Sequence, residues 1–343
     1  MSDRAISART RRNGIRSLAG YLAEPFLGKP AWMWLFFAGV VLVLLVLDLG
    51  LFHRKDHEIG VRESLSLSAF YIALGVGFGG WVWWELGRES GVEYLTGFVV
   101  EKSLAMDNVF VIAMIFGYFQ VPRMYQHRVL FWGILGVILL RGAMIAGGAA
   151  LVERYDWVLY VFAGFLVLTG LRMLREADRE YDIRANPVLR FVRKHLRVTD
   201  ELHGHAFFVR LPDPATGHRR VWMTPLFLAL MAIETADVIF AVDSVPAIFA
   251  ITTDPYLVFT SNIFAILGLR ALYFALAAIL YRFQYLKYAL SVLLIFIGSK
   301  VFVAPALGLE KFPASWSLSG TAIILGSGIL YSWARTRTGR SAA

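Results

Sequence analysis

Long apolar stretches alternate with short polar connections along the whole chain. Nine stretches are long enough to cross about 30 Å of hydrocarbon as helices that rise 1.5 Å per residue. They lie near residues 31–52, 65–84, 92–119, 129–151, 157–174, 224–250, 257–280, 287–309 and 317–334. Unbroken apolar runs favour helices, because a membrane barrel would show short strands of alternating polarity. The pattern predicts an all-α integral membrane protein with about nine transmembrane helices.

The composition agrees with this prediction. Hydrophobic residues make up 58% and charged residues 17% of the 343 residues, whereas about 25% of a typical soluble domain is charged. The net charge of +9 comes from basic residues that flank the apolar stretches, so we expect no nucleic-acid partner. The absence of cysteine excludes thiolate metal sites and leaves oxygen and imidazole as ligands. We expect no tightly bound cofactor.

The distribution of Lys and Arg predicts an orientation. The basic connections alternate in sequence with connections that carry few or no basic residues, which places the basic ones in the cytoplasm. We therefore expect a multi-pass protein of the inner (plasma) membrane, with the 175–222 loop and the C-terminal tail, 335–343, in the cytoplasm. The N-terminal tail, 1–30, is then outside, although its six basic residues oppose that placement. The first apolar stretch lacks a convincing cleavage site and is expected to be a retained helix.

The 175–222 loop is the only sizeable polar segment. Its first part is expected to continue the fifth span as a charged amphipathic helix. A hairpin is expected around the turn from Pro212 to Gly217. His203, His205 and His218 bind a metal or sense pH in one interpretation, but their spacing fits no closed zinc pattern, which favours a solvated loop.

An internal repeat organises the membrane region of the chain, residues 31–334. Segments offset by about 130 residues match at Tyr, Gly and basic positions, including Gly170 with Gly298 and Arg141 with Arg270. Repeat one covers about 92–174 and repeat two about 224–309. Because each repeat has three crossings, the second must be inverted relative to the first. Inverted repeats with special residues near the middle of the membrane are a recurrent plan of secondary transporters.

Two matching acidic phrases provide the candidate site. They run from Glu101 to Asp107-Asn108 and from Asp237 to Asp243-Ser244, each inside an apolar stretch, where a carboxylate costs at least about 2.5 kcal/mol. A separation of six residues turns side chains about 120° apart, so neither phrase chelates one ion from a regular helix. The candidate metal ligands are Asp107, Asp243, Glu101, Asp237, Glu234, Asn108 and Ser244.

Local features of the second phrase and its surroundings bear on how these acids converge. Glu234 and Asp237 are three residues apart and share a helix face. Pro246 removes the amide donor of the Val242 carbonyl, which favours a local break of the helix beside Asp243. Asp48, at the end of the first stretch, either lines a vestibule or is a charge at a helix end.

An all-oxygen ligand set suits hard or borderline divalent ions such as Mn²⁺, Mg²⁺ or Ca²⁺, and the residues alone do not rank these ions. The alternative is that the acids form structural ion pairs inside the bundle. The candidate cations for such pairs are Lys102, Arg141, Arg270 and Lys300.

The phrases Glu101-Lys-Ser-Leu-Ala-Met-Asp107-Asn108 and Glu234-Thr-Ala-Asp237-Val-Ile-Phe-Ala-Val-Asp243-Ser244 resemble the TerC family of integral membrane proteins, particularly its Alx-like branch. Asp48-Leu-Gly-Leu-Phe-His53 matches as well, and the likeness covers roughly residues 35–305. The resemblance implies an association with tellurium resistance, export of manganese linked to alkaline pH, and placement of the motif acids in the ion path.

The resulting hypothesis is export of Mn²⁺ by alternating access, coupled to protons that return through the same carboxylates. The protein is expected not to be an enzyme, and we find no phosphate-binding loop for ATP. The alternative is a membrane partner that delivers metal to secreted proteins or helps to insert them, or a tellurite-stress factor without transport activity. The oligomeric state is left open.

Overall fold

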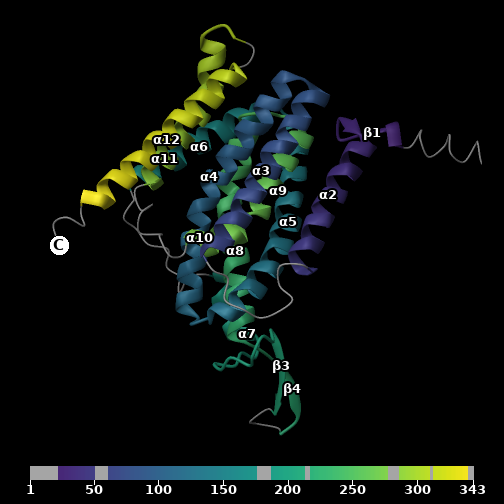
Figure 1. Ribbon diagram of the computed structural model, residues 1–343, viewed down its shortest axis with the longest axis vertical. Coiled ribbons are helices and arrows are strands. Elements are labelled where there is room, and N and C mark those ends of the chain that lie inside the picture. Colours follow the sequence, from purple (N-terminus) through teal and green to yellow (C-terminus); the bar gives the residue numbers. More distant parts are fainter. Residues whose placement is uncertain are drawn as a thin grey trace, which may run out of the picture. The chain divides into compact units, whose positions relative to one another are not determined.

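A computed structural model describes residues 22–50, 61–175, 187–212, 217–276, 286–309 and 312–338. The chain divides into two compact units (Figure 1). One contains Met1–His57 together with Asp254–Tyr256, and the other contains Glu58–Thr253 together with Leu257–Ala343. The assignment of the first apolar helix to a unit of its own was not predicted from the sequence.

The first unit is built on one helix. Strands β1 (Pro25–Phe26) and β2 (Lys29–Pro30) pair antiparallel and lead into α2 (Ala31–Gly50). The short segment 254–256 belongs to this unit because Lys29 Nζ lies 2.8 Å from Asp254 Oδ2. The ring of Trp34 also packs edge-on against Tyr256, with the ring centroids 5.0 Å apart. These contacts join the start of α2 to the segment that precedes the seventh apolar stretch.

The second unit contains nearly all of the helices. Gly87 separates α3 from α4 with a left-handed φ of 89°, and Pro225 is at the first turn of α8, where its missing amide hydrogen costs nothing. The helices that follow α2 are α3 (Val61–Leu86), α4 (Arg88–Tyr118), α5 (Arg123–Arg154), α6 (Trp157–Arg175), α7 (Pro187–His195), α8 (Pro225–Phe249), α9 (Pro255–Leu267), α10 (Leu269–Leu276), α11 (Leu286–Ala306) and α12 (Ala314–Thr338). All of them belong to the second unit except the first two residues of α9, Pro255 and Tyr256, which belong to the first.

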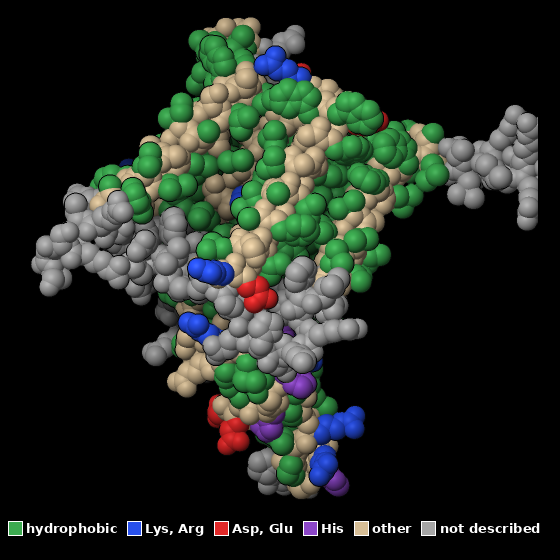
Figure 2. Space-filling view, in the orientation of Figure 1, with side chains coloured by type: hydrophobic (Ala, Val, Ile, Leu, Met, Phe, Trp, Pro, Cys, Tyr) green, Lys and Arg blue, Asp and Glu red, His purple; other side chains and the backbone are tan. Residues whose placement is uncertain are grey.

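In the described part of the chain, each of the nine stretches predicted from the sequence contains a helix, and the mostly helical membrane architecture is confirmed. Within the described residues, α3 from Arg62 onward, α5, α6, α8 and α11 are each long and apolar enough to cross a membrane. On the face shown in Figure 2, apolar side chains are spread along the helices, and charged side chains are few there. The number of nine crossings stays a prediction.

Two helices differ from the expected form. The seventh stretch was expected to be one helix over 257–280, but it is interrupted at Gly268 into α9 and α10 and is described only to Leu276. The expected break at Pro246 is wrong, because α8 continues through this proline to Phe249. Proline inside a helix removes one backbone hydrogen bond and tends to kink the chain, but Pro246 lies in the last turn of α8, so the preceding turns keep their hydrogen bonds.

The hairpin predicted in the polar loop is confirmed. Strand β3 (Phe208–Pro212) pairs antiparallel with β4 (Arg219–Met223), and Leu211 lies opposite Arg220. Thr224 anchors the base of the hairpin by donating its hydroxyl to the carbonyl of Ala206 at 2.7 Å. The predicted amphipathic extension of the fifth span falls largely on residues 176–186, outside the described residues, and α7 is a separate short helix.

Helices α6 and α11 pack through a reciprocal glycine contact. A Cβ at Gly170 of α6 would lie 2.7 Å from the carbonyl oxygen of Ser291 on α11. A Cβ at Gly298 of α11 would lie 2.6 Å from the carbonyl oxygen of Ala163 on α6. In the repeat alignment, Gly298 is the counterpart of Gly170 and Ser291 is the counterpart of Ala163. Such an exchange of equivalent contacts is what a two-fold relation between the helices produces.

Candidate functional site

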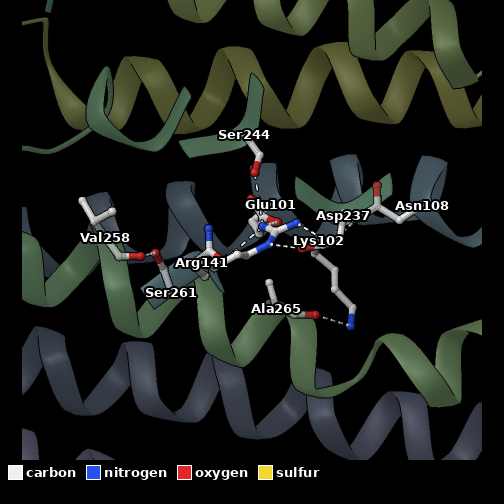
Figure 3. Close-up of polar contacts among 10 residues, drawn as sticks. Glu101, Lys102, Asn108, Arg141, Asp237, Ser244, Val258, Ser261 and Ala265 are labelled. Carbon is white, nitrogen blue, oxygen red and sulfur yellow. Dashed lines mark hydrogen bonds and ion pairs between the residues drawn. The ribbon is translucent and has the colours of Figure 1, made fainter. Parts of the chain in front are cut away.

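A fully buried arginine lies at the centre of the polar residues in the second unit. Arg141 is close to the middle of α5, and its side chain is 1% exposed. Its Nη1 forms an ion pair with Oε1 of Glu101 from α4, which is 0% exposed. Its Nε and Nη2 donate to the two carboxylate oxygens of Asp237 from α8, at 3.2 and 3.0 Å (Figure 3). Arg141 therefore joins the first acid of one phrase to the first acid of the other.

Neutral oxygens complete the surroundings of the guanidinium. Nη1 of Arg141 also donates to Oγ of Ser244 at 3.2 Å and to Oδ1 of Asn262 at 3.1 Å. The side-chain amide of Asn108 donates to Oδ1 of Asp237 at 3.2 Å. Four helices, α4, α5, α8 and α9, thus contribute side chains to one buried set, which we call the Arg141 cluster: Glu101, Asn108, Arg141, Asp237, Ser244 and Asn262.

Sequence reasoning missed Asn262 as a member of this cluster. This residue is fully buried in α9, beside Thr260 and Ser261 and between apolar residues on both sides. The polar triplet Thr260-Ser261-Asn262 in the middle of an apolar stretch was the signal that could have found it, because an amide at that depth needs a partner.

The second acid of the second phrase, Asp243, has a different partner from the first acid of that phrase, Asp237. Asp243 is partly buried, and its Oδ1 accepts a hydrogen bond from the hydroxyl of Thr169 on α6 at 3.2 Å. Asp237 of the same helix faces Arg141 on α5 instead. This divergence agrees with the rotation of about 120° expected for six residues of a regular helix. Asp107 lies in α4, but its side chain is outside the described residues.

The carboxyl group of Glu234 packs against α5 at Gly136, which has no side chain. A Cβ added to Gly136 would lie 2.3 Å from Oε1 of Glu234, so the carboxyl group rests where a side chain would otherwise be. Its Oε2 is buried and has no hydrogen-bond partner. Glu234 and Asp237 both face α5, as their spacing of three residues predicted.

Of the four candidate cations, Arg141 forms the ion pairs with the motif acids. Lys102 donates instead to the carbonyl of Ala265 at 3.0 Å, and Lys300 donates to the hydroxyl of Ser317 at 2.9 Å. The side chains of Arg270 and Asp48 are outside the described residues. The alternative of an ion pair inside the bundle therefore describes Glu101 and Asp237 in this structure.

The cluster carries two carboxylates for one guanidinium, and two of its polar atoms lack partners. Oε2 of Glu101 and Nδ2 of Asn262 are buried without a hydrogen bond. Among the side chains that the structure describes, no three acidic or histidine groups converge in the way a metal ion requires, and this includes the loop histidines. The arrangement is an oxygen-rich site whose acids face an arginine.

Long apolar helices that surround a buried charged cluster define a multi-pass α-helical integral membrane protein. The chain belongs to the TerC family, because residues 86–340 match the model described as the integral membrane protein TerC family. This confirms the resemblance carried by the two acidic phrases.

Similar proteins share most of this chain. An uncharacterized membrane protein of Myxococcus xanthus is 43% identical over 313 residues, which cover 91% of this chain and 95% of the relative. An uncharacterized membrane protein of Rickettsia bellii is 44% identical over 299 residues, covering 87% and 96%. The Alx protein of Escherichia coli, provisionally described as a membrane-bound redox modulator, is 45% identical over 280 residues, covering 79% and 85%. No solved structure matches the chain.

Proposed function

We propose that this protein exports a divalent cation, with Mn²⁺ as the first candidate, by alternating access through an acidic site inside the membrane. The observation that carries the proposal is the meeting of the two acidic phrases. Glu101 and Asp237 hold corresponding places in the phrases, and both reach the same group, Arg141. Since buried carboxylates inside a membrane are costly, their convergence at one point favours a transport site.

The chemistry of the cluster supports a hard cation as the cargo. Its acceptors are carboxylate, amide and hydroxyl oxygens, which suit Mn²⁺, Mg²⁺ and Ca²⁺ better than soft ions. We assign Glu101 and Asp237 as the central ligands, with Asn108, Ser244 and Glu234 as further contributors. The sequence-based hypothesis made Asp107 and Asp243 the core ligands and Glu101, Glu234 and Asp237 further ligands or proton carriers. We now propose Asp107 and Asp243 as ligands or proton carriers at a second position along the ion path.

The reciprocal packing of Gly170 and Gly298 supports the proposed inverted repeats. Gly170 packs against Ser291 of α11, and Gly298 packs against Ala163 of α6. Ser291 and Ala163 occupy equivalent positions in the two repeats. Two triplets of helices related in this way can exchange conformations, which is how inverted repeats produce alternating access.

The proposed orientation puts the N-terminus outside and the hairpin, with the C-terminus, in the cytoplasm of the inner membrane. The ion pair between Lys29 and Asp254 supports one part of this proposal, since both residues fall on the side assigned to the exterior. Carrying two charges outward against an interior-negative potential costs about 4.6 kcal/mol per 100 mV. Return of two protons through the carboxylates would cancel that charge, and we propose this coupling in place of ATP hydrolysis or any enzymatic step.

The export proposal is tested by the manganese content of cells that carry the wild type or the Glu101→Gln and Asp237→Asn variants. Cells with the wild type should hold less Mn²⁺ than cells without the protein, and both variants should lose this effect. Sealed vesicles then test the coupling, because an imposed pH gradient should change the rate of Mn²⁺ movement. Wild-type vesicles that show no Mn²⁺ movement would refute export, and movement that ignores the gradient would refute coupling.

A second candidate function is that of a membrane partner for metal delivery to secreted proteins or for their insertion. The β3–β4 hairpin favours it, because Phe208 and Val221 are exposed on a polar segment outside the helices. Replacing both residues with Ser should abolish function if the hairpin docks a partner, while Glu101→Gln should be tolerated. The export proposal expects the opposite result.

The Alx relative is described as a redox modulator, and the composition of this chain restricts how such a role could apply to it. Because the chain contains no cysteine, a redox or tellurium-resistance effect would have to arise without thiol exchange in this protein. We propose that any such effect follows from its action on metal content. Tellurite sensitivity measured with and without added Mn²⁺ tests this, since resistance independent of metal supply would exclude it.

A further inference from the structure

The Arg141 guanidinium occupies a position shaped like a cation site. Oxygens from Glu101, Asp237, Ser244 and Asn262 accept hydrogen bonds from it, and these residues come from three different helices. A set of carboxylate, hydroxyl and amide oxygens that converge from separate helices is the kind that holds a hard divalent ion. In this structure the positive charge is supplied by α5 itself.

The cluster can accept more positive charge than Arg141 provides. Two carboxylates face one guanidinium, and Oε2 of Glu101 is buried with no hydrogen-bond partner. Nδ2 of Asn262 is also buried and unpaired, but as a hydrogen-bond donor it suits a water molecule, so the capacity for a cation rests on Oε2 of Glu101. Buried polar atoms without partners mark a place where an ion or a water molecule belongs.

Lys102, a second cation close to the Arg141 cluster, does not bond to the acids of the cluster. Lys102 is next to Glu101 in the chain, yet its ammonium group donates to the carbonyl of Ala265 and rests over Gly268. A Cβ at Gly268 would lie 2.7 Å from Nζ of Lys102. Helix rotation therefore turns Lys102 away from the acids and leaves them to Arg141.

We propose that Arg141 is a tethered counter-ion that occupies the acidic site when no ion is bound, and that a divalent cation displaces it from Glu101 and Asp237. This inference rests on the proposed export function and specifies how the site avoids bare negative charge between transport cycles. A planar guanidinium keeps the oxygens of the two acids apart, whereas a divalent ion requires them within about 2.0–2.6 Å of one centre. Exchange of one for the other would draw α4 and α8 together.

Mn²⁺ binding to the purified protein tests the proposal. Free Mn²⁺ would be measured by electron paramagnetic resonance, and the shift of the unfolding temperature with added Mn²⁺ would be recorded in parallel. We expect Arg141→Gln to bind Mn²⁺ at least tenfold more tightly than the wild type, because the internal competitor is gone. Arg141→Lys retains a positive charge and should stay within about threefold of the wild type. The matched control is Lys102→Gln, which removes a nearby cation that contacts no described acid and should also stay within about threefold.

The result that overturns the proposal is a folded Arg141→Gln protein that binds Mn²⁺ no more tightly than the wild type. Because this variant leaves two buried carboxylates without a counter-ion, it can fail to fold in the absence of metal. It should then be produced with Mn²⁺ present, and the yield of folded protein should recover with Mn²⁺ but not with an equal ionic strength of K⁺. Equal yields with the two salts would also overturn the proposal.

A transport assay in vesicles distinguishes failure of the counter-ion proposal from failure of the export proposal. If wild-type vesicles move Mn²⁺ while Arg141→Gln shows no gain in affinity, export stands and the tethered counter-ion is refuted. If Arg141→Gln binds more tightly and loses this binding when Glu101→Gln is added, but wild-type vesicles move no Mn²⁺, the counter-ion stands and export is refuted.

Discussion

Asn108 of α4 donates its side-chain amide to the carboxylate of Asp237 on α8 at 3.2 Å, so the two acidic phrases bond directly to each other. Asn108 follows the last acid of the first phrase, and Asp237 is the first acid of the second. The hydrogen bond leaves Asp237 with two kinds of partner, a neutral amide and the Arg141 guanidinium. The position of this carboxylate is therefore fixed from both α4 and α5.

Replacing Asn108 with Ala should weaken both stability and export. The variant loses one buried hydrogen bond, which corresponds to about 1 kcal/mol in the free energy of unfolding, and it frees Asp237 to move. Denaturation in detergent and cellular Mn²⁺ content would measure the two effects. Ser103→Ala is the control, because the Ser103 hydroxyl bonds to the carbonyl of Val99 within α4. An equal loss of stability and export in both variants would show that the hydrogen bond from Asn108 to Asp237 has no particular role in export.

Asp237→Asn and Asp243→Asn should differ in stability although both reduce export. The first removes a carboxylate that neutralises a fully buried arginine, and breaking a buried pair in this way costs about 3–5 kcal/mol. The second acts on a partly buried carboxylate, which accepts a hydrogen bond from Thr169 and is attracted by the charge of Arg172, and should cost about 1 kcal/mol. Thermal unfolding of the purified variants compares them. Similar losses of stability in the two variants would contradict the expected difference.

Gly170→Ala and Gly298→Ala should each destabilise the α6 and α11 pair. The added methyl group would lie within 2.7 Å of a backbone carbonyl oxygen in both cases, and a backbone atom cannot rotate away. Overpacking of this kind costs about 1–3 kcal/mol. Gly164→Ala on α6 is the matched control, because a Cβ there meets nothing within 4 Å. If the Gly170→Ala and Gly298→Ala variants unfold at the same temperature as the control, α6 and α11 do not pack closely at these glycines.

Gly136→Ala should reduce export more than stability. The new methyl group would displace the carboxyl group of Glu234, which is the flexible end of a side chain and can move aside. The free energy of unfolding should change by about 1 kcal/mol or less, since Ala also favours the helix. Gly147→Ala on the same helix meets nothing within 4 Å and should preserve export. Unchanged export in Gly136→Ala would remove Glu234 from the ion path.

Much of the fold follows from local patterns in the sequence. The positions of α3, α4, α5 and α8 were predicted within several residues, because a helix in a membrane needs an uninterrupted apolar stretch of a set length. The hairpin around the turn after Pro212 was predicted from turn residues between short strands. The break at Gly268 was not predicted, although glycine weakens a helix, because a single glycine inside an apolar stretch does not by itself end a helix.

The sequence by itself determined which polar groups lie within the long apolar stretches and that they occur in two matching phrases. Only the tertiary structure decided that Glu101 and Asp237 share Arg141, that Asn262 joins them, and that Lys102 turns to a backbone carbonyl. The reason is physical. Hydropathy and spacing are properties of neighbouring residues, whereas the partner of a buried charge depends on the rotation and contact of helices that are far apart in the chain.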